Sequence, residues 1–303
     1  MSRLCLAISS FRNDVEIERL LREEHDRAAT PFSRIFVVDS LGTGRLSDLI
    51  QREGWDNVTY FSAAENIGSA GNLALRLELA ERAGFQYCYT VNHDGVIDHN
   101  VVEHLLEVAE GRPKVGAVYP LRYLTERGCY DLTGLRNSPL PLKAAKTIPN
   151  SSAVPVFWGS SNGALYSLEP VRAGLRPWSD LWMGWEDLGY GWLLHRTGYQ
   201  QFLATQARVE DDKEYVTHSP MPRLRLTIND KPSWYAYYQL RNLILITRRN
   251  ERPPWDYAVL VGRIAQELLL TSLFRKSKRA RYALLIRGIA DGIRGRSGKG
   301  KVP

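Results

Sequence analysis

The first 120 residues alternate between short apolar runs and segments whose apolar positions recur at helical spacing. Five runs predict strands: Leu4–Ile8, Ile35–Asp39, Asn57–Phe61, Phe85–Asp94 and Val115–Tyr119. Helices are predicted between them at Val15–Arg22, about Leu46–Arg52, Ser69–Arg82 and about Val101–Ala109. Strands that alternate with helices predict an α/β fold with a mostly parallel, Rossmann-like sheet and helices on both faces.

The pattern changes after about residue 120. The stretch from Arg122 to Pro155 is rich in Pro, Gly and Asn, which predicts a loop or short-hairpin region beside the sheet. Helical spacing returns at Ser233–Asn242 and at Tyr257–Leu273, after the break at Pro253 and Pro254. We therefore predict an α/β domain over residues 1–225, with halves of about 1–120 and 121–225, and a helical C-terminal region over residues 226–303.

Length and cysteine content constrain the class of protein. A chain of 303 residues can bury a sizeable core without disulfides or structural metals. Cys5, Cys88 and Cys129 lie far apart without zinc-type spacing, which is typical of a reducing, cytoplasmic compartment. About 18 uncharged apolar residues never run together, so we expect no membrane-spanning helix.

The net charge of +7 is concentrated at the C-terminus. The stretch from Arg275 to Pro303 holds ten of the 40 Lys and Arg residues and one of the 33 acids, so it carries +9 and the rest of the chain −2. A nearly neutral body argues against nucleic-acid binding. Apolar residues are interleaved with the cations, which predicts either a helix at an anionic membrane surface or a solvated basic face. The closing Gly292–Lys301 stretch is predicted to be disordered.

Candidate binding residues cluster where the predicted strands end. The carboxyl ends of parallel strands meet at one sheet edge, which would gather Ser9, Asp39, Asn66 and Asp94. The Asp39 carboxylate can accept hydrogen bonds from a base imide or a ribose hydroxyl, or it can cap a turn. The Gly-rich stretch Glu65–Asn72 opens a helix and can present backbone amides to a phosphate, or its glycines can merely permit a tight turn.

A second group of residues is suited to a metal ion. Asn92 and Asp94 are two residues apart at the end of a strand, where Asp94 can bind Mg²⁺ or Mn²⁺ together with a diphosphate. His218 can add a nitrogen ligand, which would favour Mn²⁺. A solvated strand-end loop and a structural histidine are the alternatives.

Glu186 and Asp187 are adjacent acids among aromatic residues. Their mutual repulsion raises one proton affinity toward that of a general base; the alternative is an acid pair that favours a helix N-terminus. The turn around Trp158, Gly159 and Ser160 is expected to line the same cleft, where Trp158 or Trp185 offers a stacking face for a sugar or fills the core.

Six short motifs, in this order and spacing, resemble those of family 2 glycosyltransferases, and bacterial rhamnosyl- and galactofuranosyltransferases most closely. They are Ile8–Arg12, Val37–Ser40, Asn66–Asn72, Asn92–Asp94, Gly163–Leu165 and Trp185–Asp187. The resemblance covers about Leu4 to Asn242. It implies a GT-A fold, a nucleotide-diphosphate-sugar donor with UDP- or dTDP-sugars favoured, Mn²⁺ or Mg²⁺, and inversion at the anomeric carbon.

The resemblance also implies roles for single residues. Asp187 matches the catalytic base and Glu186 its neighbour on the acceptor side, while Asp94 and His218 match the metal ligands. The donor-site set is Ser9, Phe11, Arg12, Asp39, Asn66, Gly68, Asn72, Asn92 and Asp94, and the acceptor-site set is Trp158, Gly159, Ser160, Trp185 and Glu186. Residues 1–120 would then bind the nucleotide and residues 121–225 the acceptor.

Two departures from the family pattern affect these assignments. Asn92 replaces the usual first acid of the metal motif, which leaves the metal to Asp94 and His218, and Gly189 replaces an acid that many relatives carry after the Glu-Asp pair. The expected function is transfer of a sugar to a glycan or lipid-linked acceptor in cell-surface polysaccharide synthesis, by a cytoplasmic enzyme peripheral to the inner face of the membrane. The alternatives are a nucleotidyltransferase and a non-catalytic sugar- or nucleic-acid-binding module.

Overall fold

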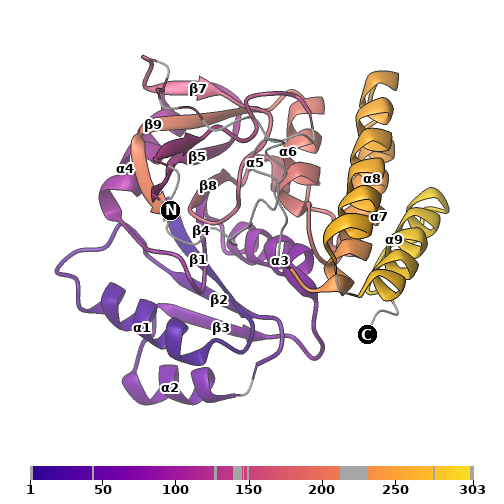
Figure 1. The fold of residues 1–303 in the computed structure, drawn as a ribbon. Helices are drawn as coiled ribbons and strands as arrows, with labels where there is room; N and C mark the ends of the chain where they lie inside the picture. Colours follow the sequence, from indigo (N-terminus) through magenta and orange to yellow (C-terminus); the bar gives the residue numbers. More distant parts are fainter. Residues whose placement is uncertain are drawn as a thin grey trace.

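A nine-stranded sheet forms the centre of the molecule (Figure 1). The computed structural model describes residues 3–42, 44–125, 128–138, 145, 147–148, 150–211, 231–275 and 277–300. The strands are β1 (Leu4–Ser10), β2 (Ile35–Asp39), β3 (Val58–Ser62), β4 (Tyr87–Asn92), β5 (Val115–Leu124), β6 (Cys129–Asp131), β7 (Ala153–Pro155), β8 (Ala164–Ser167) and β9 (Gln200–Asp211). The helices are α1 (Asp14–His25), α2 (Arg45–Glu53), α3 (Gly68–Arg82), α4 (His99–Glu110), α5 (Glu169–Arg172), η2 (Ser179–Leu181), α6 (Glu186–Arg196), α7 (Ser233–Arg249), α8 (Pro254–Phe274) and α9 (Lys278–Ile293).

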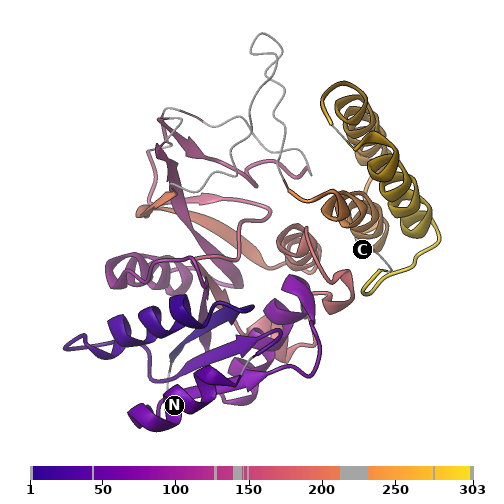
Figure 2. The same ribbon diagram turned by 60° about the horizontal axis from the view of Figure 1, so that its bottom comes forward.

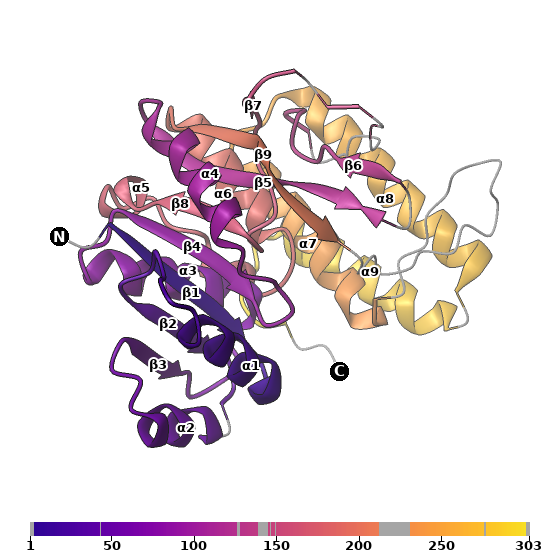
Figure 3. The ribbon, with the colours of Figure 1, turned by 90° about the vertical axis from the view of Figure 1, so that its left-hand side faces the viewer.

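The sheet has a parallel half and a mixed half. Its order is β3-β2-β1-β4-β8-β5-β9-β7, with β6 paired to β5, and neighbouring strands lie side by side in Figure 3. Strands β3, β2, β1 and β4 are parallel, as the alternating pattern of the first 120 residues predicts. Beyond β4 the pairing is mixed, because β8 runs antiparallel between β4 and β5.

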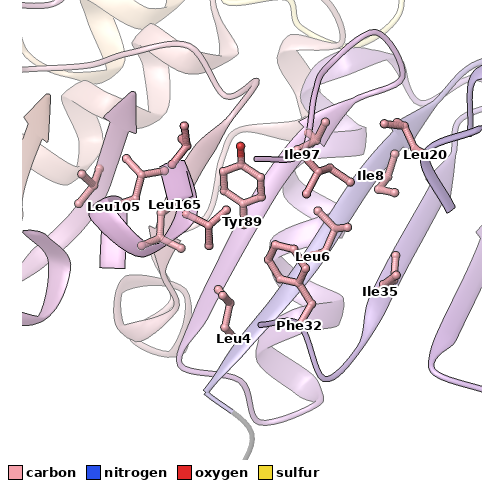
Figure 4. Packing of buried hydrophobic residues seen from close by; sticks show 14 of the residues in the cluster. Leu4, Leu6, Ile8, Leu20, Phe32, Ile35, Tyr89, Ile97, Leu105 and Leu165 are labelled. Carbon is pink, nitrogen blue, oxygen red and sulfur yellow. The ribbon is translucent and has the colours of Figure 1, made fainter. Parts of the chain in front are cut away.

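Helices cover both faces of this sheet because its strands are apolar on both sides. On one face Leu6 and Ile8 of β1 pack with the apolar sides of α1, α2 and α4, and Figure 4 shows this cluster around Phe32 and Tyr89. On the other face Cys5 and Ala7 pack with α3, α5 and α6. The three-layer arrangement places the carboxyl ends of β1, β2 and β4 at one edge.

The C-terminal helices pack against α6 rather than against the sheet. Leu188 and Trp192 of α6 share a buried cluster with Leu243 and Ile246 of α7. Helix α9 lies along α7, and both Figure 1 and Figure 2 show α7, α8 and α9 as a group at one side of the sheet. The predicted domain boundary at residues 225 and 226 lies outside the described residues.

Two expectations about the C-terminus need revision. The closing glycine-rich stretch was predicted to be disordered, and this is wrong for residues 292–300, because the Gly298 amide donates to Asp180 O at 2.5 Å and the Gly300 amide to Tyr238 Oη at 3.0 Å. The second expectation was that no helix could span a membrane. Helix α8, at 21 residues, is long and apolar enough to cross a membrane by length and composition alone, although Arg263 and Glu267 interrupt its apolar run.

Candidate active site

The parallel register brings three predicted donor residues to one edge of the sheet. Ser9 lies opposite Val38 of β2 and Asn92 of β4, and Ser10 lies opposite Asp39. Phe11 follows directly and is 41% exposed, with the Arg12 guanidinium carbon 5.5 Å from its ring centroid. Ser9 and Asp39 therefore lie at one edge as the sequence predicts, and Asn92 lies there with them, with an aromatic face and a cation nearby.

Asp39 is fully buried at this edge. Its carboxylate accepts hydrogen bonds from Ser10 Oγ at 3.2 Å, Tyr60 Oη at 3.2 Å and the Leu41 amide at 3.1 Å. Burial, followed by the charge of Asp39, raises the pKa of Tyr60 to about 12, so this phenol stays a donor at neutral pH. The contacts match the turn-capping alternative, and a nucleoside contact by Asp39 stays a prediction.

The Gly-rich stretch is fixed onto the segment that precedes the acid pair. The Asn66 side chain accepts from the Gly68 amide at 2.9 Å, and Asn66 O accepts from Trp182 Nε1 at 3.0 Å. Gly68 has φ +68°, and a Cβ there would lie 2.0 Å from Trp182 O. Asn72 is buried and donates to Val38 O at 2.8 Å. The glycine is thus required for close packing, whereas a phosphate contact stays a prediction.

The predicted metal motif contributes one carboxylate. Asp94 is exposed in the turn after β4, and the Asn92 amide donates to Asn162 Oδ1 at 2.9 Å. His218 lies outside the described residues. Among the residues that the structure does describe, no three His, Cys, Asp or Glu side chains gather in a metal-binding group. An exposed Asp94 still fits a magnesium or manganese ion whose other ligands are phosphate and water oxygens.

Asp187 opens into a cavity of about 80 Å³. The predicted acceptor residues Trp158, Gly159 and Ser160 line this cavity with it, together with Tyr119, Pro120, Arg122, Asp131, Thr133, Val156 and Leu203. Trp185 and Glu186 do not line it. The Trp185 ring contacts Trp158 edge-on at a centroid distance of 6.3 Å, and Trp158 is only 8% exposed, as the core alternative predicts.

The electrostatic environment of Asp187 suits a general base. Asp187 Oδ1 and Glu186 Oε2 are buried and have no hydrogen-bond partner among the described residues. Burial and the negative charge of Glu186 raise the pKa of Asp187 to about 7, although Ser161 and Arg76 act in the opposite direction. A carboxylate with such a pKa exchanges protons near neutral pH.

One short segment links the donor edge to this cavity. Ser160 lines the cavity, Ser161 O accepts from Thr90 Oγ1 at 2.5 Å, and Asn162 Oδ1 accepts from the Asn92 amide. Asn162 O also accepts from the Arg122 guanidinium, which lines the cavity. The segment Ser160–Asn162 therefore connects the end of β4 to the cavity that Asp187 lines.

Three solved proteins with a similar architecture are glycosyltransferases. TarS 1–349 of S. aureus matches with a TM-score of 0.58 and 9% identity over 96% of this chain and 81% of that one, and it has also been solved with UDP-GlcNAc. The mannosyltransferase PcManGT of Pyrobaculum calidifontis, in complex with GDP-Man and Mn²⁺, matches with a TM-score of 0.55 and 13% identity over 96% of this chain and 87% of that one. GalNAc-T7 with UDP, GalNAc and Mn²⁺ matches with 0.60 and 12% over 82% of this chain and 48% of that one.

The chain has the GT-A glycosyltransferase fold. No protein-family model matches the sequence, and no curated protein matches it. Identities of 9 to 13% show the fold alone. The rhamnosyl- or galactofuranosyltransferase subtype therefore stays a prediction.

Two cations beside the acid pair of this GT-A fold were missed by the sequence analysis. Arg76 of α3 is 2% exposed and donates to Ala7 O and Val91 O, each at 3.2 Å. Lys231 Nζ lies 4.1 Å from the Tyr235 ring centroid. Burial lowers the pKa of both side chains, and the charges of Glu186 and Asp187 act in the opposite direction. Helical periodicity marks Arg76 only as a polar residue in α3, so no local signal identifies its partners.

Proposed function

We propose that this protein is an inverting glycosyltransferase that moves a sugar from a nucleoside-diphosphate donor to a hydroxyl group of an acceptor. The main supporting observation is the Asp187 carboxylate, which opens into the cavity of the GT-A fold with a pKa of about 7. A base with this pKa is ionised for much of the time at neutral pH and is still able to take up a proton.

The reaction that fits this geometry is a single displacement. Asp187 removes the proton from the acceptor hydroxyl while the oxygen attacks the anomeric carbon. The bond from that carbon to the donor diphosphate breaks on the opposite face, and the nucleoside diphosphate leaves with the electron pair. Glu186 keeps Asp187 basic, because its neighbouring negative charge favours the protonated form of Asp187.

The donor is proposed to lie along the edge formed by β1, β2 and β4. Ser9, Asp39 and Asn92 are assigned to the nucleoside, the stretch from Asn66 to Asn72 to the donor loop, and Asp94 to a Mn²⁺ or Mg²⁺ ion shared with the diphosphate. When bound, such an ion neutralises the charge of the leaving diphosphate. Two of the solved neighbours contain Mn²⁺, which supports this cofactor; His218 as a further ligand stays a prediction. UDP- and dTDP-sugars are the favoured donors.

The acceptor is proposed to be a glycan or a lipid-linked glycan of cell-surface polysaccharide synthesis, reached from the inner face of the cytoplasmic membrane. Support comes from α8, where Trp255 is 75% and Val261 65% exposed, and from the exposed cations Lys278 and Arg279 of α9. Apolar side chains beside cations are typical of a helix at an anionic lipid surface.

The first test is thermal stabilisation by UDP, dTDP and GDP, each with Mn²⁺, Mg²⁺ or chelator. A ligand that binds only the folded state at a hundredfold excess over its Kd stabilises it by about 2.7 kcal/mol. We expect metal-dependent stabilisation by UDP or dTDP in the wild type and a much smaller shift in Asp94→Ala.

Asp98→Ala is the matched control for Asp94→Ala, because Asp98 is also exposed and caps α4 by accepting from the Asn100 amide. It should lower stability without changing the nucleotide shift. A wild type that responds to none of the nucleotides would argue instead for a non-catalytic binding module.

A further inference from the structure

The segment Leu181–Trp185, which we call the catalytic segment, has an unusual backbone. It directly precedes Glu186 and Asp187 in the first turn of α6. Trp182 has φ 60° and ψ −57°, and Trp185 has φ 65° and ψ 11°. Bulky residues rarely adopt positive φ, and such conformations persist only where the surroundings hold them. The contacts of this segment therefore decide where the acid pair lies.

Helix α7 holds the catalytic segment through two fully buried polar side chains. Asn242 Nδ2 lies 3.0 Å from Leu181 O, 2.8 Å from Met183 O and 2.9 Å from Gly184 O. Arg241 donates from Nη2 to Leu181 O at 2.7 Å and from Nε to Asn242 Oδ1 at 2.9 Å. Three backbone carbonyls of the segment, those of Leu181, Met183 and Gly184, thus depend on side chains that lie about 60 residues further along the chain.

The end of the chain completes this arrangement. We call residues Gly295–Gly300 the C-terminal strap. The Gly298 amide donates to Asp180 O at 2.5 Å, and Gly298 O accepts from Arg241 Nη1 at 2.6 Å. The Gly300 amide donates to Tyr238 Oη at 3.0 Å. The strap therefore contacts both the residue before the catalytic segment and the arginine that holds it.

The opposite side of the segment faces the proposed donor loop. The Ala70 amide donates to Trp182 O at 3.1 Å, and Ser69 Oγ lies 3.4 Å from Met183 Sδ. The catalytic segment therefore lies between the donor loop and helix α7.

We propose that Arg241, Asn242 and the C-terminal strap form a brace that holds the catalytic segment in its strained conformation, and that Asn242 is a positioning residue for Asp187. This inference rests on the proposed function. Without the brace, Trp182 and Trp185 relax toward ordinary backbone conformations and the first turn of α6 shifts. A displacement of about 1 Å at a reacting group can lower the rate by about 10²-fold.

The first experiment compares Asn242→Ala with Asn250→Ala. Both asparagines are buried, but Asn250 is the residue that follows α7, and among the described residues its Nδ2 donates only to Ile246 O of that helix, at 3.1 Å. We expect Asn242→Ala to lower kcat by about 10²-fold while the Kd for the stabilising nucleotide changes by less than about threefold. Asn250→Ala should leave kcat per folded molecule unchanged.

The pH profile separates positioning from a purely structural role. If the acid pair moves toward water in Asn242→Ala, burial penalises its charge less. The pH at which kcat reaches half of its maximum should then shift from near 7 down toward the ordinary pKa range of an Asp carboxyl. Activity that declines only with the folded fraction, with the half-maximal pH still near 7, would show that Asn242 is structural and would overturn the proposal.

Deletion of residues 297–303 tests the brace without altering any core side chain, so it decides the matter if Asn242→Ala fails to fold. Deletion of residues 301–303 is the control, because it keeps the strap. The longer deletion should lower kcat by tenfold or more and raise amide hydrogen exchange across residues 181–187, with β1 and β4 unchanged. Unchanged amide hydrogen exchange across residues 181–187 would overturn the brace. Faster exchange there, in a protein whose wild type transfers no sugar, would support the brace and contradict only the proposed function.

Discussion

At the scale of single residues, Asp187 combines burial with a charged neighbour. Asp187→Asn removes the base but keeps the shape of the side chain, so we expect transfer to fall by about 10²–10⁴-fold while nucleotide binding is retained. In the wild type, kcat should rise with pH through about 7, because only the ionised carboxylate accepts a proton. A pH series of kcat on both enzymes checks this, and normal turnover by Asp187→Asn would rule out the base assignment.

The same pKa predicts a gain in stability on mutation. Folding raises the pKa of Asp187 from 3.8 to about 7. The contribution of this carboxyl group to the stability of the folded protein is therefore fully present below about pH 4 and is lost as the pH rises through 7. Asn cannot ionise, so the free energy of unfolding of Asp187→Asn should exceed that of the wild type at pH 8 by about 1–4 kcal/mol.

Urea denaturation of wild type and Asp187→Asn at pH 4 and pH 8 measures this difference. Asp48→Asn, at an exposed carboxylate of α2, is the control and should show no comparable gain. Equal stability of Asp187→Asn and wild type at pH 8 would mean that the Asp187 carboxylate is not penalised by burial.

Local sequence patterns single out the candidate acids but not the residues that contact the candidate site from distant parts of the chain. Asp39, Asp94 and Asp187 follow apolar runs or lie beside aromatic residues, and these are local signals. Asn162, Arg76 and Asn242 act on residues at least 15 positions away, as Asn242 does on Leu181. Such partners depend on tertiary packing, which residue spacing does not report.

At the scale of secondary structure, α6 is seated against the turn that lines the cavity. Gly191 allows this approach, because a Cβ there would lie 2.4 Å from Trp158 Cβ and 2.7 Å from Phe157 O. Gly191→Ala should push α6 away from the turn, lower the free energy of unfolding by about 1–3 kcal/mol, and reduce kcat because Asp187 moves with the helix.

Gly262→Ala is the matched control for Gly191→Ala. Gly262 also lies within a helix, α8, but no atom lies within 4 Å of a Cβ built there. Alanine should stabilise this position by about 0.5–1 kcal/mol and leave kcat unchanged. If both substitutions had the same effect, close packing of α6 against Trp158 would not be what positions the acid.

Most helices and strands were predictable, whereas the strap was not. Periodicity located α3, α4 and α8 to within a few residues, because α3 and α4 each bury one face and α8 is a long apolar run. The glycines and cations of residues 292–300 indicate disorder by composition. Their order comes from backbone hydrogen bonds to Asp180 and Tyr238, which distant parts of the chain provide.

At the scale of the whole molecule, α8 presents an apolar face outward. Ala258, Val261, Ala265, Leu269 and Leu273 recur at helical spacing and are all exposed, while Asp256 is buried and Arg263 and Glu267 are half-buried on the inner side. Exposed cations lie next along the chain, at Lys278 and Arg279 in the first turn of α9 and at Arg294 directly after this helix. The pattern favours an anionic lipid surface as the partner, because it offers both apolar and negative groups.

Deleting the basic tail would be a poor test of membrane binding, since Leu285 of α9 is fully buried and its loss would expose the core of the helical region. Val261→Glu with Leu269→Glu instead places charges on the exposed face and spares the packing. We expect the double variant to lose binding to vesicles that contain phosphatidylglycerol while nucleotide-dependent stabilisation is retained. Val15→Glu, at an equally exposed position on α1, should bind like the wild type.

Wild-type binding should weaken with salt, because the cations of α9 contribute through screened electrostatics. Vesicle binding that survives the double substitution would exclude this face as the membrane contact, and a wild-type dimer that the substitution dissociates would assign the face to a second copy of the chain.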